Sequence, residues 1–178
     1  MTKEECYFLG KITKWNDPKI KALNTNLNLP VDRILVVRRA ESSGTTKSLS
    51  EYLSSVSRDW KKALGPRGSI KWKVGIGATG NDGVASIVSS TIGSITYVNL
   101  SHARQKKLKT AALRNSSSMY IIPSVGSISA AAKGLKFRGN SFTGSIINST
   151  SKDAYPIATL TYVLLPITVK DKKREEIY

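Results

Sequence analysis

The pattern of apolar and polar residues predicts a strand, a short turn and a helix in direct succession near the start of the chain. Residues 34–37 are four consecutive apolar residues, which is typical of a strand buried on both faces. After a polar run, apolar residues recur at helical spacing at Leu49, Tyr52, Leu53 and Val56. We therefore place the turn of a strand–turn–helix unit at about residues 38–46.

Strands and helices are predicted to alternate over most of the remaining chain. We predict further strands over 71–74, 93–98, 111–113 and 158–165, and helices starting at Asp17–Pro18 and over 57–64, 84–91, 101–108 and 124–133. This alternation indicates an α/β fold with a largely parallel mixed sheet flanked by helices. Trp15, Trp60 and Trp72 each have apolar partners in sequence, so we expect core or hinge packing rather than base stacking.

The turn after the first strand has the chemistry of an anion site. Arg38 and Arg39 end the strand, and either guanidinium can bind an anion through two N–H groups. Gly44 allows close approach of a ligand to the first amides of the helix, which have no intrahelical partner. Three hydroxyl residues can cap the helix or donate to an anion: Ser43, Thr45 and Thr46. An ordinary capped helix with solvent-facing arginines explains these residues equally well.

Glu41 is the unexpected member of this turn, because a carboxylate repels an anion. It favours binding only when the anion carries a proton for the carboxylate to accept. At neutral pH, monohydrogen phosphate carries such a proton and sulfate does not. If the turn is a binding site, Glu41 indicates a protonated oxyanion.

The charge balance also favours anionic partners. The chain has 178 residues, enough for one domain, with 28 Lys and Arg against 12 Asp and Glu, a net charge of +16. No acidic residue lies between Asp82 and Asp153. Such a field attracts phosphate, nucleic acid or anionic lipid. A generally basic proteome, or a face that meets another surface, explains the same bias.

Other motifs predict neither a catalytic nor a metal site. Residues 75–80 match G-x-G-x-x-G, but the acidic residue expected about twenty positions later in a dinucleotide site is missing. His102 is the only histidine and has no second ligand at a suitable spacing. Cys6 is the only cysteine, so it forms no internal disulfide, and we expect it to be buried. We expect no enzyme activity, because no nucleophile–base pair is evident, and no cofactor.

Residues 36–45 resemble the phosphate-binding signature of the periplasmic phosphate-binding proteins of the ABC-type phosphate importer, the PstS family. Blocks at 10–18, 74–84 and 153–157 resemble the same family in order and approximate spacing. The resemblance implies one lobe of a two-lobed, hinge-closing periplasmic-binding-protein fold of type II. It assigns 1–157 to the second lobe and 158–178 to a return strand and charged end of an incomplete first lobe, as in a chain truncated at both ends.

The resemblance also implies roles for the residues of the turn. Arg39 matches the arginine that grips phosphate. The residues matching the turn that binds phosphate oxygens are Ser43, Gly44 and Thr45. Glu41 stands where the family has Asp, the acceptor for the phosphate proton, and its extra methylene changes its reach. Ser42 replaces a glycine of the family pattern.

The function implied by the resemblance is binding of inorganic phosphate for delivery to the membrane subunits of an ABC importer. We expect a monomer, located in the periplasm or at the cell surface, with no nucleic-acid partner and no signal peptide in this chain. Two other functions stay open: a basic module that binds polyanions or nucleic acid, and a truncated remnant that binds nothing. Selectivity between phosphate and sulfate distinguishes the first function from the second, whose affinity would fall steeply with salt.

Overall fold

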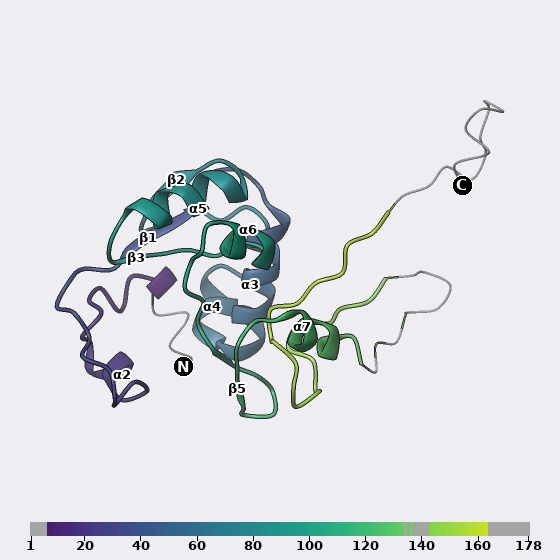
Figure 1. Ribbon diagram of the computed structural model, residues 1–178. Helices are drawn as coiled ribbons and strands as arrows, with labels where there is room; N and C mark the ends of the chain where they lie inside the picture. The colour runs from purple at the N-terminus through teal and green to yellow at the C-terminus, as the bar shows by residue number, and fades with distance from the viewer. Residues whose placement is uncertain (1–6, 134, 136, 138–142, 164–178) are drawn as a thin grey trace.

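The computed structural model describes residues 7–133, 135, 137 and 143–163, and its elements follow the predicted alternation (Figure 1). In chain order they are α2 (Pro18–Lys21), β1 (Leu35–Arg39), α3 (Gly44–Val56), α4 (Arg58–Ala63), β2 (Ile76–Ala78), α5 (Gly80–Ser90), β3 (Ser94–Ile95), α6 (Leu100–Gln105), β4 (Leu113–Arg114), β5 (Tyr120–Ile121) and α7 (Val125–Ala131). Within these ranges, no helix is long and apolar enough to cross a bilayer.

Strand β1 is the centre of a three-stranded parallel sheet with the order β2-β1-β3. Val37 lies beside Ile76 of β2, and Leu35 lies beside Ser94 of β3. Parallel strands of one sheet need crossover connections, which α3 and α4 supply between β1 and β2, and α5 supplies between β2 and β3. In Figure 1, α5 lies above the sheet and α3 and α4 lie below it. This arrangement confirms the predicted α/β class.

The main core lies between the sheet and the helices α3 and α4. Val36 of β1 packs there with the apolar face of α3, which includes Tyr52 and Leu53. Trp60 of α4 is fully buried, and Trp72 packs against the same cluster. Burial of each such large side chain contributes roughly 1.5–3 kcal/mol. The predicted packing role of these two tryptophans is confirmed.

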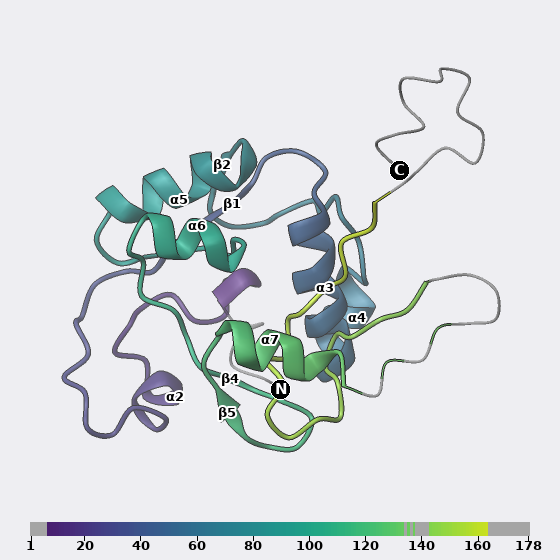
Figure 2. The ribbon, with the colours of Figure 1, turned by 45° about the vertical axis from the view of Figure 1, so that its right-hand side comes forward.

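A second part of the chain packs beside α3 and α4. Strands β4 and β5 pair antiparallel, with Arg114 opposite Tyr120, and α7 lies next to them in both views (Figures 1 and 2). The Tyr52 hydroxyl donates to the Arg114 carbonyl at 3.1 Å, which ties α3 to β4. Ser124 is the N-cap of α7 and forms a capping box with Ser127. The Ser124 Oγ accepts the Ser127 amide, and the Ser124 amide donates to the Ser127 Oγ.

The strand predicted over 71–74 is wrong, because the strand in this region is β2, which begins two residues after the predicted strand ends. Trp72 and Val74 face the core while Lys71 and Lys73 are exposed, so burial alternates without ladder pairing. Gly75 explains where pairing begins. It has φ +82°, and a Cβ there would lie 2.3 Å from the Val36 carbonyl oxygen, so only glycine lets β2 approach β1.

One other strand prediction was too long, the strand predicted over 158–165 is wrong for residues 158–163, and several helix boundaries moved. Only Ser94 and Ile95 of the predicted 93–98 strand pair with β1. Residues 158–163 form no strand, since none of the described segments pairs with them. Residues 164 and 165 of this prediction lie outside the described residues. Helix α5 begins at Gly80 rather than at residue 84. The boundary predicted after residue 157 stays a prediction, and Cys6 lies outside the described residues.

Candidate functional site

The candidate site is the turn that joins the carboxyl end of β1 to the N-terminus of α3. This is the edge at which ligands bind in open parallel sheets. Successive side chains of a strand alternate between its faces, so Arg38 and Arg39 point to opposite sides of the sheet. Arg39 is the one that contacts other residues of the turn, whereas the Arg38 Nη1 lies 3.5 Å from a backbone oxygen of Arg39.

The Arg39 guanidinium is held in place by two side chains. Its Nε donates to Glu41 Oε1 at 2.6 Å, and its Nη2 forms an ion pair with the same oxygen. Its Nη1 donates to Asn81 Oδ1 at 3.0 Å. Arginine has five N–H donors, so two remain without a partner among the described residues. The Arg39 side chain is only 13% exposed, which limits its motion.

The Glu41 carboxylate is used mainly by the protein itself. Besides Arg39, its Oε1 accepts the backbone N–H of Gly80 at 3.0 Å, the first residue of α5. Hydrogen bonding from Arg39, followed by backbone N–H groups including that of Gly80, lowers the pKa of Glu41 from 4.5 to about 2. Glu41 Oε2 is buried and has no hydrogen-bond partner within the described parts of the chain.

The N-terminus of α3 is only partly capped. Ser43 is the N-cap: its Oγ accepts from the amides of Thr45 at 3.1 Å and Thr46 at 3.3 Å, and it is 6% exposed. An oxygen that accepts two bonds still has its own proton to donate. The exposed Gly44 amide makes no hydrogen bond within the described residues, since first-turn amides lack intrahelical partners. A hydroxyl and a backbone amide therefore stay available to a ligand.

Asn81, in the first turn of α5, connects the two sides of the site. Its Oδ1 accepts from Arg39 at 3.0 Å and from the Thr45 hydroxyl at 3.4 Å. The guanidinium and the start of α3 are therefore bound to one oxygen atom. Sequence reasoning did not assign this role to Asn81. The signal was its place in the 74–84 block of the family resemblance, next to a glycine.

Gly68 lies against the turn and is bonded to it through the backbone. Its carbonyl accepts the Ser43 amide at 2.9 Å, which removes that N–H from the donors open to a ligand. A Cβ on Gly68 would lie 3.2 Å from the Ser43 carbonyl oxygen, so a side chain there would push on the turn. This contact was also missed from the sequence, because nothing in the local pattern of residues 65–70 indicates it.

The structure also explains why the glycine motif at 75–80 is not a dinucleotide loop. In that fingerprint the glycines follow a strand and open a helix, whereas here β2 lies inside the motif. His102 lies 3.7 Å from Asp82 across α5 and α6. Among the described residues, no group of three His, Cys, Asp or Glu side chains could hold a metal ion.

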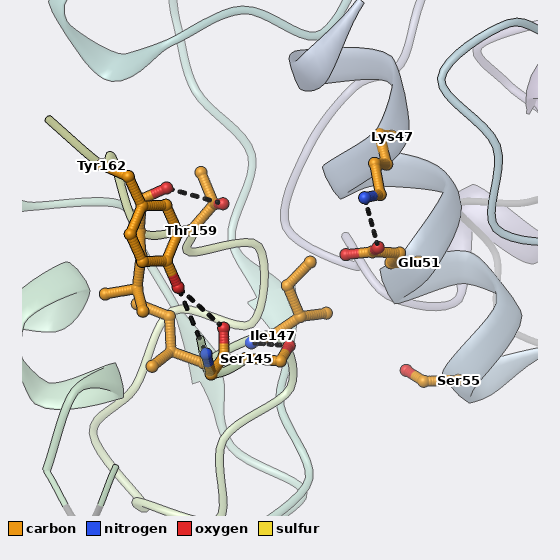
Figure 3. Close-up of a pocket in the computed structure, with 10 residues that line it drawn as sticks. Lys47, Glu51, Ser55, Ser145, Ile147, Thr159 and Tyr162 are labelled. Carbon is orange, nitrogen blue, oxygen red and sulfur yellow. Dashed lines mark hydrogen bonds and ion pairs between the residues drawn. The ribbon is translucent and has the colours of Figure 1, made fainter. Parts of the chain in front are cut away.

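A hollow of about 480 Å³ lies elsewhere, between α3 and residues 144–162 (Figure 3). Lys47, Glu51 and Ser55 line one wall, and Thr159 and Tyr162 lie on the other. No residue of the Arg39–Thr45 turn lines it. The candidate site is therefore separate from this hollow.

Comparisons with known proteins find similar sequences over most of the chain. The PBP superfamily domain model matches residues 5–170. "Phosphate-binding protein PstS" of Xylella fastidiosa is 42% identical over 165 residues, covering 92% of this chain and 45% of that protein. PstS of Haemophilus influenzae is 42% identical over 159 residues, covering 89% and 48%. PstS of Methanocaldococcus jannaschii is 34% identical over 172 residues, covering 89% and 44%.

The solved structure of a high affinity periplasmic phosphate-binding protein bound with phosphate superimposes with a TM-score of 0.58 at 17% identity. It covers 86% of this chain and 46% of that chain, and at this identity it shows a shared fold. The chain spans about half the length of the curated relatives it matches. The predicted resemblance to PstS proteins is confirmed by these matches, and the domain match over residues 5–170 shows that the chain belongs to the PBP superfamily.

Proposed function

We propose that this chain binds inorganic phosphate at the Arg39–Thr45 turn, as part of the substrate-binding component of an ABC phosphate importer. The observation that carries the proposal is the Arg39 guanidinium. It is fixed by Glu41 and Asn81 and keeps two N–H groups without a partner in the described residues. The proposal is supported by relatives named phosphate-binding proteins, 42% identical over most of this chain.

A tetrahedral oxyanion suits the donors that the turn leaves available. Arg39 offers two N–H groups, and α3 offers the Gly44 amide with the favourable end of a 13-residue helix dipole. The Ser43 hydroxyl adds a donor, and the Thr45 hydroxyl, which donates to Asn81 Oδ1 at 3.4 Å, can exchange that long bond for one to the anion. Charge-assisted bonds of this kind each contribute about 1.5–3 kcal/mol when the partners are desolvated. All five proposed phosphate-binding residues, Arg39, Glu41, Ser43, Gly44 and Thr45, thus have a defined part.

Glu41 has two parts in this proposal. Its Oε1 orients Arg39, and its Oε2, buried without a partner in the described residues, is the acceptor for the proton of monohydrogen phosphate. A fully ionised oxyanion would leave that acceptor unmet and would be repelled by it. Hydrogen-bond discrimination in a built site can reach about 10⁴-fold. The site should therefore prefer phosphate over sulfate.

The open surroundings of the turn set the expected strength of binding. Ser42 and Gly44 are exposed, so a bound anion keeps solvent on one side and its charge pairs stay partly hydrated. We expect a dissociation constant on the order of 1 mM, or about 4 kcal/mol, for this chain alone. Closure by further protein around the anion would tighten it.

Titration calorimetry with phosphate and sulfate at pH 8 tests the proposal. We expect weak, saturable phosphate binding, weaker sulfate binding, and a shift of that ratio toward sulfate in Glu41→Gln, which replaces the acceptor by an amide. Micromolar binding by the chain alone would contradict an open site. Equal binding of both anions by the wild type, or an unchanged ratio of phosphate to sulfate affinity in Glu41→Gln, would show that Glu41 does not contact the ligand.

The wider setting belongs to the same proposal. We propose that the protein does no catalysis, works in the periplasm or at the cell surface, delivers phosphate to the membrane subunits of the importer, and acts as a monomer. Polyanion binding is the second candidate, favoured by exposed basic residues after α6, including Lys106, Lys107 and Lys109. It predicts binding to long polyanions that weakens steeply with salt, and no preference between the two small anions.

A further inference from the structure

The side chain of Tyr97 reaches both ends of the anion turn. Its hydroxyl oxygen accepts the backbone N–H of Arg39, the last residue of β1, at 3.2 Å. The same oxygen lies 2.8 Å from the Thr46 Oγ1, in the first turn of α3. Tyr97 itself follows β3, 58 and 51 residues further along the chain. One oxygen atom from the segment after β3 therefore joins the two ends of the turn.

Hydrogen-bond chemistry fixes the direction of the bond from Arg39 and allows either hydroxyl to donate in the bond between Tyr97 and Thr46. A backbone N–H can only donate, so the Tyr97 oxygen accepts from Arg39. Burial raises the pKa of Tyr97 above its usual value of 10, so the hydroxyl keeps its proton at neutral pH. That proton is then free to be donated to Thr46, whose side chain is 1% exposed. Both bonds can be made at once without competition.

The aromatic ring of Tyr97 is itself held firmly. It stacks on Trp72 with centroids 6.1 Å apart and an interplanar angle of 27°. Phe8 meets it edge-on at 5.7 Å and 69°. Trp72 in turn contacts Trp60 of the core. The hydroxyl is therefore carried on a rigid support that reaches from the core to the edge of the sheet.

We infer that Tyr97 is a positioning residue for the anion turn. Its hydroxyl sets the distance between the end of β1 and the start of α3. The donors of Arg39 and Gly44 can then point toward the same anion. Binding energy depends on this alignment, because donors that are displaced must reorganise before they can bind. The inference rests on the proposed phosphate site.

Two matched tyrosine variants test the inference. Tyr97→Phe removes only the hydroxyl and keeps the stacked ring. Tyr52→Phe removes a hydroxyl from a fully buried ring whose bond, to the Arg114 carbonyl at 3.1 Å, lies away from the turn. We expect Tyr97→Phe to weaken phosphate binding about tenfold, and Tyr52→Phe to leave it unchanged, at similar losses of thermal stability.

A second measurement separates failure of the inference from failure of the proposed function. Backbone amide exchange over residues 39–46, measured without phosphate, should be faster in Tyr97→Phe and unchanged in Tyr52→Phe. Wild-type protein that binds no phosphate would refute the proposed function, while the exchange data would still decide whether Tyr97 holds the turn. Wild-type exchange in Tyr97→Phe, or equal losses of affinity in both variants, would overturn the positioning role.

Discussion

Two helices begin beside β1, and their N-termini are used in opposite ways. At α5, the first amide, that of Gly80, donates to the Glu41 carboxylate, and the N-cap Thr79 makes no side-chain cap bond. At α3, Ser43 caps the second and third amides and leaves that of Gly44 without a partner in the described residues. The protein's own anion thus binds the α5 end, and the α3 end keeps an amide that is free among the described residues, where we propose that an external anion binds.

This difference explains how a carboxylate can lie in the proposed anion site. Glu41 is neutralised on one oxygen by Arg39 and by the start of α5, and its pKa of about 2 keeps it ionised at neutral pH. Its charge serves to fix the guanidinium. The same pairing offsets part of the positive charge of Arg39, which is a further reason to expect modest affinity.

The largest expected effect comes from Arg39. Arg39→Ala removes both remaining N–H donors and leaves the Glu41 charge without its partner, so phosphate binding should fall at least a hundredfold. Arg38→Ala, on the opposite side of the strand, should change it far less. Titration calorimetry measures both, with circular dichroism to verify folding. Equal losses from the two variants, each recovered at low salt, would favour diffuse electrostatics over a defined site.

The next largest effect is the difference in stability between substitutions at the two N-caps, Ser43 of α3 and Thr79 of α5. Ser43→Ala removes the acceptor of two amides and should destabilise the protein by about 1 kcal/mol. Thr79→Ala removes a side chain that makes no cap bond, so it should cost only a few tenths of that. Urea unfolding compares them. If Thr79→Ala proves the more damaging change, the assignment of caps at the two helix ends is wrong.

The smallest effect is a pH dependence carried by Glu41. Because its pKa is lower in the folded chain than the usual 4.5, the stability it contributes is complete above pH 4.5 and is lost as the pH falls toward 2. The pair is partly exposed, which keeps the effect small. The melting temperature of wild type minus that of Glu41→Gln should be constant above pH 4.5 and shrink between pH 4.5 and 3. A difference that stays constant down to pH 3 would contradict the lowered pKa.

Local patterns predicted the centre of the site well. The apolar run at 34–37 and the helical spacing from Leu49 to Val56 located β1 and α3, and Ser43 was one of three capping residues considered. Asp17 caps α2 with Pro18 at its first position, also as predicted. These features depend on neighbours within a few residues, which a sequence pattern records directly.

Contacts between distant segments were missed. Asn81 and Tyr97 lie 42 and 58 residues from Arg39 in sequence, and only the crossing of α5 and the pairing of β3 bring them to it. The bond from the Gly80 amide, at the start of α5, to Glu41 spans 39 residues and was missed for the same reason. The position of β2 depended on Gly75, whose approach to Val36 is visible only once the strands are paired.

The most direct test of the central claim follows the amides of the two helix ends during a phosphate titration. In nitrogen–proton correlation spectra of labelled protein at pH 8, the Gly44 amide and the Arg39 side chain should shift together and saturate in the millimolar range. The Gly80 amide, already bound to Glu41, should move little. A titration in which Gly80 shifts and Gly44 does not, or in which the shifts spread over the basic residues after α6 without saturating, would contradict the account.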